Sequence, residues 1–248
     1  MSSPPVGVVL YGPPCSGKST ITTALHQLDA RFRLLRKLKV GTGRADEYDM
    51  VTAEQLDQLR RAGRLLVQTY RYGNIYAVDR RQIEDMSSTG HAPVVHMGNI
   101  ADLRRLVGRT PDAWLRVLLW VPREVTERRS KDRGDTDTTE RLRAWDETLA
   151  DLTANAGEGF FHLRLCTDRL DAEAAAKEII AAFDALTRAA ESRRRDAVSK
   201  TCQPRTECDP YVTRCRTGQT THRWGGRHQA DPRGLHDERT RPRPPLQH

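Results

Sequence analysis

The sequence predicts an α/β fold in which helices cover both faces of a central parallel sheet. Across residues 6–198, short apolar runs alternate with segments of helical periodicity, an order that is typical of parallel sheets. The first apolar run, at residues 6–11, leads directly into a glycine-rich turn and then into a helical segment. A buried parallel strand followed by such a turn and helix is the setting in which a phosphate-binding loop occurs.

The individual elements follow from periodicity and length. The candidate strands are the mostly apolar runs at residues 6–11, 32–35, 93–97, 115–121 and 160–165. The candidate helices are residues 20–28, 53–62, 79–88, 100–107, 123–129, 138–153 and 172–190. Thr52 is the expected cap of one helix, because a polar residue, Gln55, follows it by three positions. The last helix has one apolar face and is expected to pack along the sheet.

The turn after the first strand has the phosphate-binding pattern G-x-x-x-x-G-K-[ST]. Its glycines allow backbone N–H groups to turn toward phosphate oxygens, and the helix that follows adds the positive end of its dipole. We expect Lys18 to bridge the β- and γ-phosphates of a nucleoside triphosphate and the Ser19 hydroxyl to ligate Mg²⁺. The expected nucleotide-binding residues are Gly12, Pro13, Pro14, Cys15, Ser16, Gly17, Lys18, Ser19 and Thr20.

Composition divides the chain into two parts. The chain has 248 residues, of which 37% are hydrophobic, a low share for a chain that is packed throughout. After about residue 198 aliphatic residues become rare, and Thr, Arg, Gly, Pro and His dominate. Such a segment cannot offset its ordering entropy by burial, so residues 199–248 are expected to be a disordered, basic tail. Residues 1–198 are the expected folded domain.

Charge and cysteine content exclude several classes of protein. The tail holds ten of the 41 Lys and Arg residues but only five of the 33 Asp and Glu residues, so most of the net charge of +8 lies there. Nucleic-acid binding by the folded domain is therefore not favoured. The five cysteines do not form a disulfide framework, and those of the tail lack zinc-ligand spacing. No run approaches the roughly 20 apolar residues of a membrane span, and no signal peptide is recognisable, so a cytoplasmic location is expected.

A second set of residues extends the phosphate-binding pattern. Five short motifs follow one another at specific separations, namely Arg36-x-x-Lys39, Tyr48, the segment 51–56, Ala62-Gly63 and Gly73-Asn74-Ile75-Tyr76. With the loop at 12–20, this spacing resembles the guanylate kinase family of P-loop nucleoside monophosphate kinases, from about residue 6 to 151. The resemblance implies a three-layer P-loop kinase fold, a small substrate-binding insertion near 36–78 and a helical lid near 123–145. Met97-Gly98-Asn99 and Ala101-Asp102-Leu103 look more like ribose 1,5-bisphosphate kinases.

The resemblance also implies roles for particular residues. Arg36 and Lys39 correspond to the family's two phosphate-gripping arginines, and Tyr48 and Tyr76 to its phosphate-contacting tyrosines. Two cations and two phenolic donors can neutralise and orient the phosphate of an acceptor. The lid segment resembles the family's R-x-x-x-R-G. A shortened interval before the next helix favours Arg129 and Arg133, rather than Arg141, as the arginines that act with Lys18 in catalysis.

The family's base-contacting positions are not kept. Its guanine-binding glutamate corresponds to Val67, and a nearby hydroxyl residue to Val78. An aspartate pair borne on a strand corresponds to His96 and Gly98. The pocket is therefore expected to be more apolar than a guanine site. Guanine bound in such a pocket would have unpaired N–H donors, at a cost of about 1–3 kcal/mol each, so guanine is not favoured as the acceptor's base. His96 is expected at a strand end, facing the substrate.

Three interpretations of function remain open from the sequence, besides a weaker one in which the basic tail binds nucleic acid. The first is an ATP- and Mg²⁺-dependent phosphotransferase of the nucleoside monophosphate kinase type, acting on a small phosphorylated acceptor. The second is a kinase whose acceptor is a sugar phosphate such as ribose 1,5-bisphosphate. The third is a non-catalytic guanylate kinase-like binding module, against which the intact Lys18 and Ser19 argue. The sequence does not indicate an oligomeric state.

Overall fold

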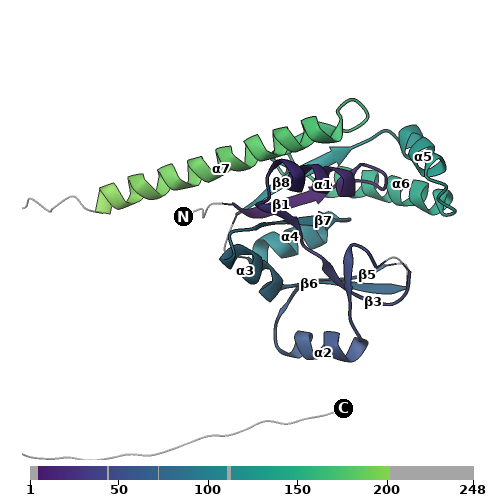
Figure 1. The fold of residues 1–248 in the computed structure, drawn as a ribbon, viewed down its shortest axis with the longest axis horizontal. Coiled ribbons are helices and arrows are strands. Elements are labelled where there is room, and N and C mark those ends of the chain that lie inside the picture. Colours follow the sequence, from purple (N-terminus) through teal and green to yellow (C-terminus); the bar gives the residue numbers. More distant parts are fainter. Residues whose placement is uncertain (1–4, 44, 72, 111–112, 202–248) are drawn as a thin grey trace, which may run out of the picture. The chain divides into compact units, whose positions relative to one another are not determined.

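The computed structural model describes residues 5–43, 45–71, 73–110 and 113–201 (Figure 1). Its strands are β1 (Pro5–Tyr11), β2 (Phe32–Leu34), β3 (Lys37–Val40), β4 (Tyr48–Met50), β5 (Leu65–Arg71), β6 (Asn74–Asp79), β7 (Ala92–Met97), β8 (Ala113–Trp120) and β9 (Leu163–Cys166). Its helices are α1 (Lys18–Leu28), α2 (Ala53–Arg61), α3 (Arg80–Ser88), α4 (Ile100–Arg109), α5 (Arg123–Asp132), α6 (Thr138–Asn155) and α7 (Ala172–Thr201).

The central sheet is parallel throughout, with the strand order β2-β7-β1-β8-β9. Strand β1 occupies the middle and is buried on both faces, as its nearly continuous apolar sequence predicts. Val8 and Leu10 belong to one core cluster, and Val9 and Tyr11 belong to the cluster on the opposite face. The prediction of an α/β fold with a central parallel sheet is confirmed.

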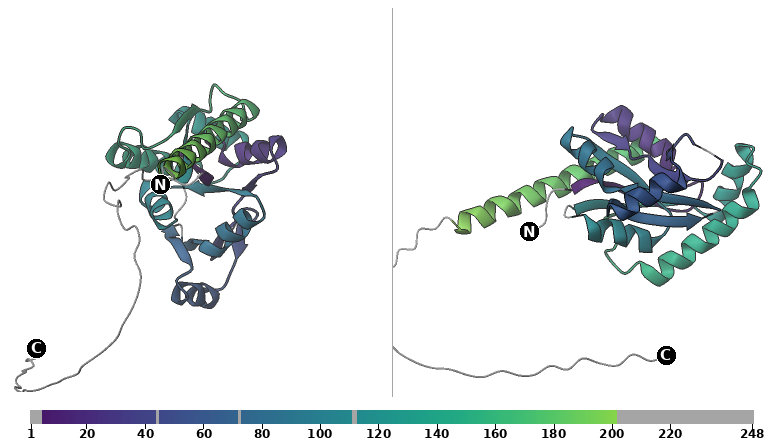
Figure 2. Two further views of the ribbon diagram at one scale, coloured as in Figure 1. Left: turned by 90° about the vertical axis from the view of Figure 1, so that its left-hand side faces the viewer. Right: turned by 90° about the horizontal axis from the view of Figure 1, so that it is seen from below.

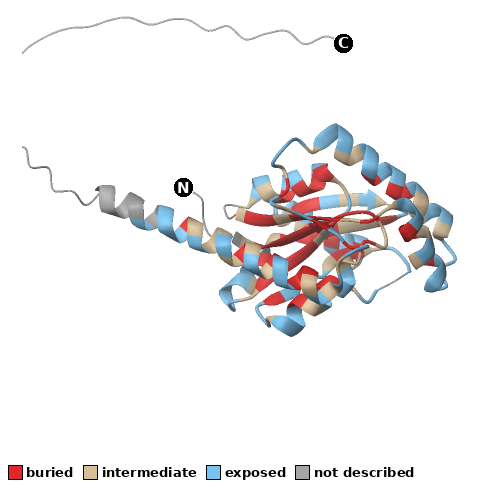
Figure 3. Ribbon diagram, turned by 90° about the horizontal axis from the view of Figure 1, so that it is seen from above, coloured by how far each residue is buried: buried red, intermediate tan, exposed pale blue. Residues whose placement is uncertain are grey.

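Helices cover both faces of this sheet and complete the three layers (Figure 1). On one face, Ile21 and Leu25 of α1 pack with Ile179 and Phe183 of α7 against the sheet. On the other face, α3 and α4 contribute their own apolar residues to the second cluster. Figure 3 shows the buried residues concentrated in the central strands and on the helix surfaces that face them. Apolar burial on both faces thus holds the carboxyl ends of the strands in fixed positions.

The segment between β2 and α3 forms a small sheet of its own, with the strand order β4-β3-β6-β5. Strands β3 and β4 are parallel, whereas β6 is antiparallel to both β3 and β5. None of these strands was among the candidates from the sequence. Strands β3 and β4 span only four and three residues, and the second half of β5 is polar. Figures 1 and 2 show α2 at the end of this insertion that is remote from α1 and α7.

The four elements after β8 all differ from their expected bounds, and α6 only by two residues at its end. Strand β9 begins at Leu163 rather than at 160, because the rings of Phe160 and Phe161 pack against each other, 5.0 Å apart, before the strand starts. Helix α5 continues to Asp132. Helix α7 continues to Thr201, beyond both the expected helix end at 190 and the expected domain boundary at 198. The remainder of the expected tail, 202–248, lies outside the described residues.

Helices α5 and α6 pack against each other, and α6 also contacts α4. They occupy the range in which the resemblance implies a lid.

Within the residues that the structure describes, no helix has both the length and the apolar character that crossing a bilayer requires.

Candidate functional site

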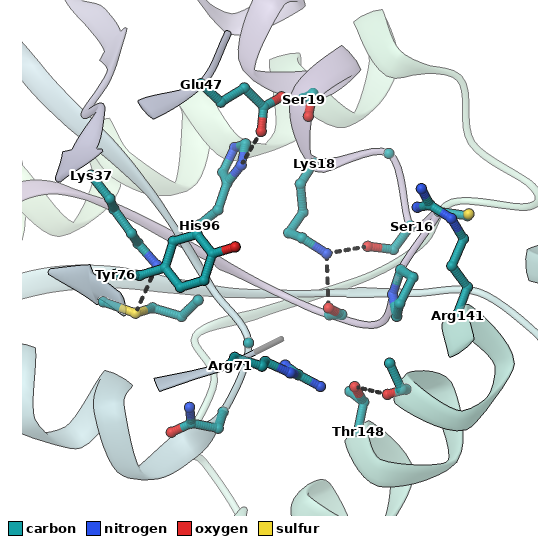
Figure 4. A pocket seen from close by; sticks show the side chains of 18 of the residues that line it. Ser16, Lys18, Ser19, Lys37, Glu47, Arg71, Tyr76, His96, Arg141 and Thr148 are labelled. Carbon is teal, nitrogen blue, oxygen red and sulfur yellow. Dashed lines mark hydrogen bonds and ion pairs between the residues drawn. The ribbon is translucent and has the colours of Figure 1, made fainter. Parts of the chain in front are cut away.

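A cavity of about 340 Å³ lies where the loop after β1 meets the end of β7, the small sheet and α6. In parallel α/β sheets, ligands bind at this carboxyl edge of the strands. Figure 4 shows side chains from all these elements pointing into the cavity. Of the expected nucleotide-binding residues, those that line it are Gly12, Pro14, Cys15, Ser16, Gly17, Lys18, Ser19 and Thr20.

The loop after β1 has a constrained backbone conformation. A side chain at Gly12 would place its Cβ 2.1 Å from the Leu119 carbonyl oxygen, so only glycine fits there. Gly17, at the N-cap of α1, has φ +84°, in the left-handed region. Cys15 also has positive φ, at 59°, which is uncommon for a residue with a side chain and frequent at functional sites. The loop is therefore held in one specific conformation.

Lys18 is turned back over this loop. Its Nζ donates hydrogen bonds of 2.8 Å to the carbonyl oxygens of Gly12 and Pro13, and one of 3.3 Å to Ser16 Oγ. Burial lowers the pKa of Lys18 to about 8, although the negative charge of Glu47 opposes this shift. An anion in the cavity would restore the preference of the amine for its charged form.

The expected catalytic arginines approach the loop from two sides. Arg133 lines the cavity, and its Nη2 lies 2.6 Å from Cys15 Sγ. Arg129 lines a neighbouring cavity of about 380 Å³ and donates hydrogen bonds to the carbonyl oxygens of Cys15 and Thr167. Arg141, which the sequence disfavoured, lines the central cavity together with Arg133. The structure thus brings Arg133 and Arg141 to the loop's open side and puts Arg129 in contact with its backbone.

The expected acceptor residues are also divided. Tyr48 and Tyr76 line the cavity, with ring centroids 5.2 Å apart. Lys39 is buried beside them, and its Nζ lies 5.3 Å and 5.8 Å from the two ring centroids. Arg36 does not line the cavity. It pairs with Asp49 at 2.8 Å and donates to the Tyr48 carbonyl oxygen, so it holds strand β4 in place.

The expected base-contacting position, Val67, is buried in the core and lies outside the cavity lining. It pairs with Val78 across β5 and β6. Two residues further along the same face of β5, Thr69 lines the cavity and donates a hydrogen bond to Asp102. Asp102 also accepts from the Asn99 side chain at 2.8 Å. The wall of this part of the cavity is therefore polar, although Val67 and Val78 behind it are apolar.

His96 stands at the end of β7 and lines the cavity, as expected from the sequence. Its Nε2 lies 2.8 Å from Thr22 Oγ1, and its Nδ1 lies 3.9 Å from a carboxylate oxygen of Glu47. Burial, reinforced by the positive charges of Lys18 and Lys37, lowers the pKa of His96 to about 3. The ring is therefore neutral near pH 7.

Sequence reasoning missed further charged residues of the cavity, namely Lys37, Glu47 and Arg71. Lys37 lies two residues before Lys39 on β3, so it projects from the same face. Its Nζ contacts Met97 Sδ at 3.7 Å, and burial lowers its pKa to about 8. Recognising β3 as a strand would have pointed to Lys37. Glu47 and Arg71 reach the cavity only through the tertiary fold and had no local sequence signal.

The residues present fit a metal–nucleotide. The loop precedes the N-terminus of α1, where backbone N–H groups favour negative charge, and Gly12 and Gly17 allow its backbone conformation. Lys18, Arg133 and Arg141 add positive charge to the same cavity. Ser19 supplies a hydroxyl oxygen and Glu47 a carboxylate, the kinds of ligand that Mg²⁺ prefers.

No family model matches the chain, and no curated protein sequence matches it significantly. Among solved structures, a guanylate kinase from Anaplasma phagocytophilum is similar, with 17% identity, a TM-score of 0.53, and coverage of 75% of this chain and 87% of that chain. A gluconokinase from Sinorhizobium meliloti 1021 matches with 16% identity and a TM-score of 0.45, over 78% of this chain and 99% of that chain.

The first of these similarities, together with the parallel sheet and the loop geometry, defines the class of fold as that of the P-loop kinases. Within this class, the chain has a guanylate kinase-like fold. At this level of identity the likeness concerns the fold alone.

Proposed function

We propose that this protein is an ATP- and Mg²⁺-dependent phosphotransferase of the nucleoside monophosphate kinase type. The observation that carries the proposal is that a single cavity joins the phosphate-binding loop to Tyr48 and Tyr76. Lys18 and Arg133 stand at the loop end of the cavity. A donor γ-phosphate on the loop and an acceptor phosphate at the tyrosines would therefore share one space, as direct transfer requires.

Each group has a defined task in such a transfer. The N–H groups of the loop and Lys18 would bind the donor phosphates, and Arg133 and Arg141 would stabilise the charge of the phosphoryl group in transit. When bound, Mg²⁺ would neutralise phosphate charge with Ser19 among its ligands. Arg129 would hold the loop from its far side through the Cys15 carbonyl oxygen.

The acceptor would be held from the small sheet. Tyr48 and Tyr76 offer phenolic O–H donors, and Lys39 places a cation against both rings. Arg36 would act indirectly, by fixing the strand that carries Tyr48. An acceptor phosphate is already ionised, so no general base is needed, and the neutral His96 is given no catalytic role.

A sugar phosphate is a second candidate for the acceptor. It is favoured by Val67 and Val78, which offer no partner for the N–H groups of guanine and lie behind the cavity wall. Thr69, Asn99 and Asp102 line that wall and carry hydroxyl, amide and carboxylate groups, which suit the hydroxyl groups of a sugar.

The proposal is tested by coupled ADP release against a panel of acceptors. The panel contains GMP, dGMP, AMP, CMP, UMP, ribose 1,5-bisphosphate and a control without acceptor. We expect turnover that depends on one acceptor class and falls at least about 100-fold in Lys18→Ala. Lys177→Ala, on the exposed surface of α7, is the matched control and should retain full turnover. ATP binding without turnover for any acceptor would favour a binding module instead.

A further inference from the structure

The carboxylate of Glu47 is unusual among the groups that line the central cavity. Its side chain is only 25% exposed, and it makes no hydrogen bond within the part of the chain that the structure describes. Its nearest charged or ionisable partner there is His96, with 3.9 Å between Glu47 Oε2 and His96 Nδ1. A largely buried carboxylate without hydrogen-bond donors is costly unless a cation compensates it.

The hydrogen bonds of His96 show that its ring does not provide that compensation. Thr22 has one hydroxyl proton, which it donates to the Lys18 carbonyl oxygen at 2.9 Å. His96 Nε2, 2.8 Å from the same hydroxyl oxygen, must therefore be the donor in that contact. The other ring nitrogen, Nδ1, lies 3.9 Å from Glu47 Oε2, which is beyond hydrogen-bond distance. The ring therefore leaves the carboxylate without a hydrogen bond, and a cation or its bound water would provide a partner.

Glu47 lies on the same side of the central cavity as Ser19 (Figure 4). Glu47 and Ser19 line the central cavity together, and both also line a neighbouring cavity with Thr22. Figure 4 shows both side chains directed into the same part of the cavity, beside Lys18. Glu47 is also close enough to Lys18 to counteract the effect of burial on the amine. The carboxylate thus stands beside the hydroxyl expected to bind the metal.

Asp102 is the other carboxylate among the described residues that line the cavity, and it is already engaged. It accepts hydrogen bonds from Thr69, Asn99 and Arg105, the last at 2.9 Å. Strand β7 ends in His96 and Met97, so it offers no carboxylate beside Ser19. Glu47 is therefore the available carboxylate.

We propose that Glu47 supplies the carboxylate for the divalent cation that accompanies the nucleotide, directly or through a bound water. This inference rests on the proposed function, because it presupposes a metal–nucleotide on the loop. Mg²⁺ bound with a nucleotide typically has one or two protein carboxylates besides phosphate oxygens and waters. Glu47 comes from the insertion and precedes Tyr48, so the metal and the acceptor would be held by adjacent residues.

The test uses Mn²⁺ as the probe, with a non-hydrolysable ATP analogue and the full-length protein. Paramagnetic resonance measures the affinity of the protein–nucleotide complex for Mn²⁺. We expect Glu47→Gln to weaken Mn²⁺ binding by about 10- to 100-fold, and Glu47→Asp to weaken it less. Glu54→Gln changes an exposed glutamate of α2 in the same insertion and should match the wild type. Thermal unfolding without ligand verifies that each variant is folded.

A second arm measures analogue binding in EDTA. There Glu47→Gln should bind the analogue at least as tightly as the wild type, because a negative charge near the phosphates has been removed. The proposal would be overturned if Glu47→Gln weakened binding of the analogue equally with metal and in EDTA. It would also be overturned if Glu47→Gln kept the wild-type affinity for Mn²⁺ while Ser19→Ala lost that affinity. Failure of the wild type to bind the metal–nucleotide at all would refute the proposed function itself, and the inference with it.

Discussion

At the scale of single residues, the site is defined by two amines whose burial lowers their pKa. Lys18 and Lys37 both have a pKa lowered to about 8 by burial, and both point into the central cavity. Such amines are held at a cost in free energy, because the protein interior solvates them less well than water does. A bound phosphate offsets that cost. Lys18 and Lys37 thus lower the stability of the ligand-free protein, and the same two amines would bind an anion.

The pKa of Lys18 predicts how nucleotide binding depends on pH. A phosphate favours the charged amine, so the pKa in the complex lies above the value of about 8 in the free protein. Affinity for ATP should therefore be constant below pH 8 and fall by up to about tenfold per pH unit above it. Isothermal titration calorimetry between about pH 7 and pH 9 measures this dependence.

Two variants separate Lys18 from its neighbours in this pH dependence. Lys18→Arg keeps its charge throughout the range and should lose the decline in affinity that Lys18 causes. Lys37→Met removes the other amine with a similar pKa and should retain that decline. Glu47, Arg71 and Cys15 also act on Lys18 and are unchanged in both variants. Affinity for ATP that stays constant to pH 9 in the wild type would contradict a buried, titrating Lys18.

At the scale of elements, the segment expected to be a lid carries two kinds of arginine. Arg141 of α6 lines the cavity and pairs with Asp137 at 2.8 Å, whereas Arg129 of α5 donates to the backbone of the loop. We expect Arg141→Ala to lower kcat about 100-fold or more with a smaller change in KM, since its charge acts on the phosphoryl group in transit. Arg129→Ala should weaken ATP binding and lower the stability of the loop.

Steady-state kinetics of the two variants measure this difference. Arg143→Ala is the control, because this neighbouring arginine is highly exposed, pairs with Glu147 and does not line the cavity. An unchanged kcat in Arg141→Ala, with a large loss in Arg129→Ala, would restore the assignment that the sequence favoured.

The insertion has a local stabilising feature at the start of α2. Thr52 Oγ1 accepts from the Gln55 N–H at 3.1 Å, and Gln55 Oε1 accepts from the Thr52 N–H at 2.8 Å. Thr52→Ala should lower the free energy of unfolding by about 1 kcal/mol. Thr153→Ala, whose hydroxyl donates only within α6, should change it by less than about 0.5 kcal/mol. Urea denaturation gives both values, and equal losses in the two variants would contradict a specific cap.

The sequence predicted those elements that form by local rules. The cap at Thr52 is confirmed, as are the central strands, because long apolar runs and capping patterns are legible in a few consecutive residues. The strands of the insertion were missed, since β3 and β4 are short and their lysines and acidic residues hide the alternation. Strand β3 is stabilised by pairing with β6, a contact made by residues distant in the sequence, and β4 pairs in turn with β3.

The same distinction holds for the candidate site. The loop at 12–20 could be recognised because its residues are contiguous. Glu47, Arg71 and Asp102 arrive from three separate elements and become neighbours of the loop only in the folded chain. Arg36 and Val67 were assigned to the substrate by resemblance, yet Arg36 braces β4 and Val67 lies in the core. Position in a pattern does not specify which way a side chain points.

At the scale of the whole molecule, two sheets meet at one cavity. The loop follows a strand of the central sheet, the small sheet provides Tyr48 and Tyr76, and the turn before β4 provides Glu47. Helices α5 and α6 add arginines, so every element beside the cavity contributes charge or a hydrogen-bond donor. This arrangement suits a reaction in which two phosphorylated molecules must be held together while water is excluded.

The central claim is phosphoryl transfer within that cavity, and transfer of label tests it most directly. The wild type, in excess over ATP labelled in the γ-phosphate, is mixed with the acceptor found in the panel, and the products are separated after a single turnover. The account predicts label in the phosphorylated acceptor, none in inorganic phosphate, and no transfer by Lys18→Ala. Label released only as inorganic phosphate, or retained in ATP for every acceptor, would contradict it.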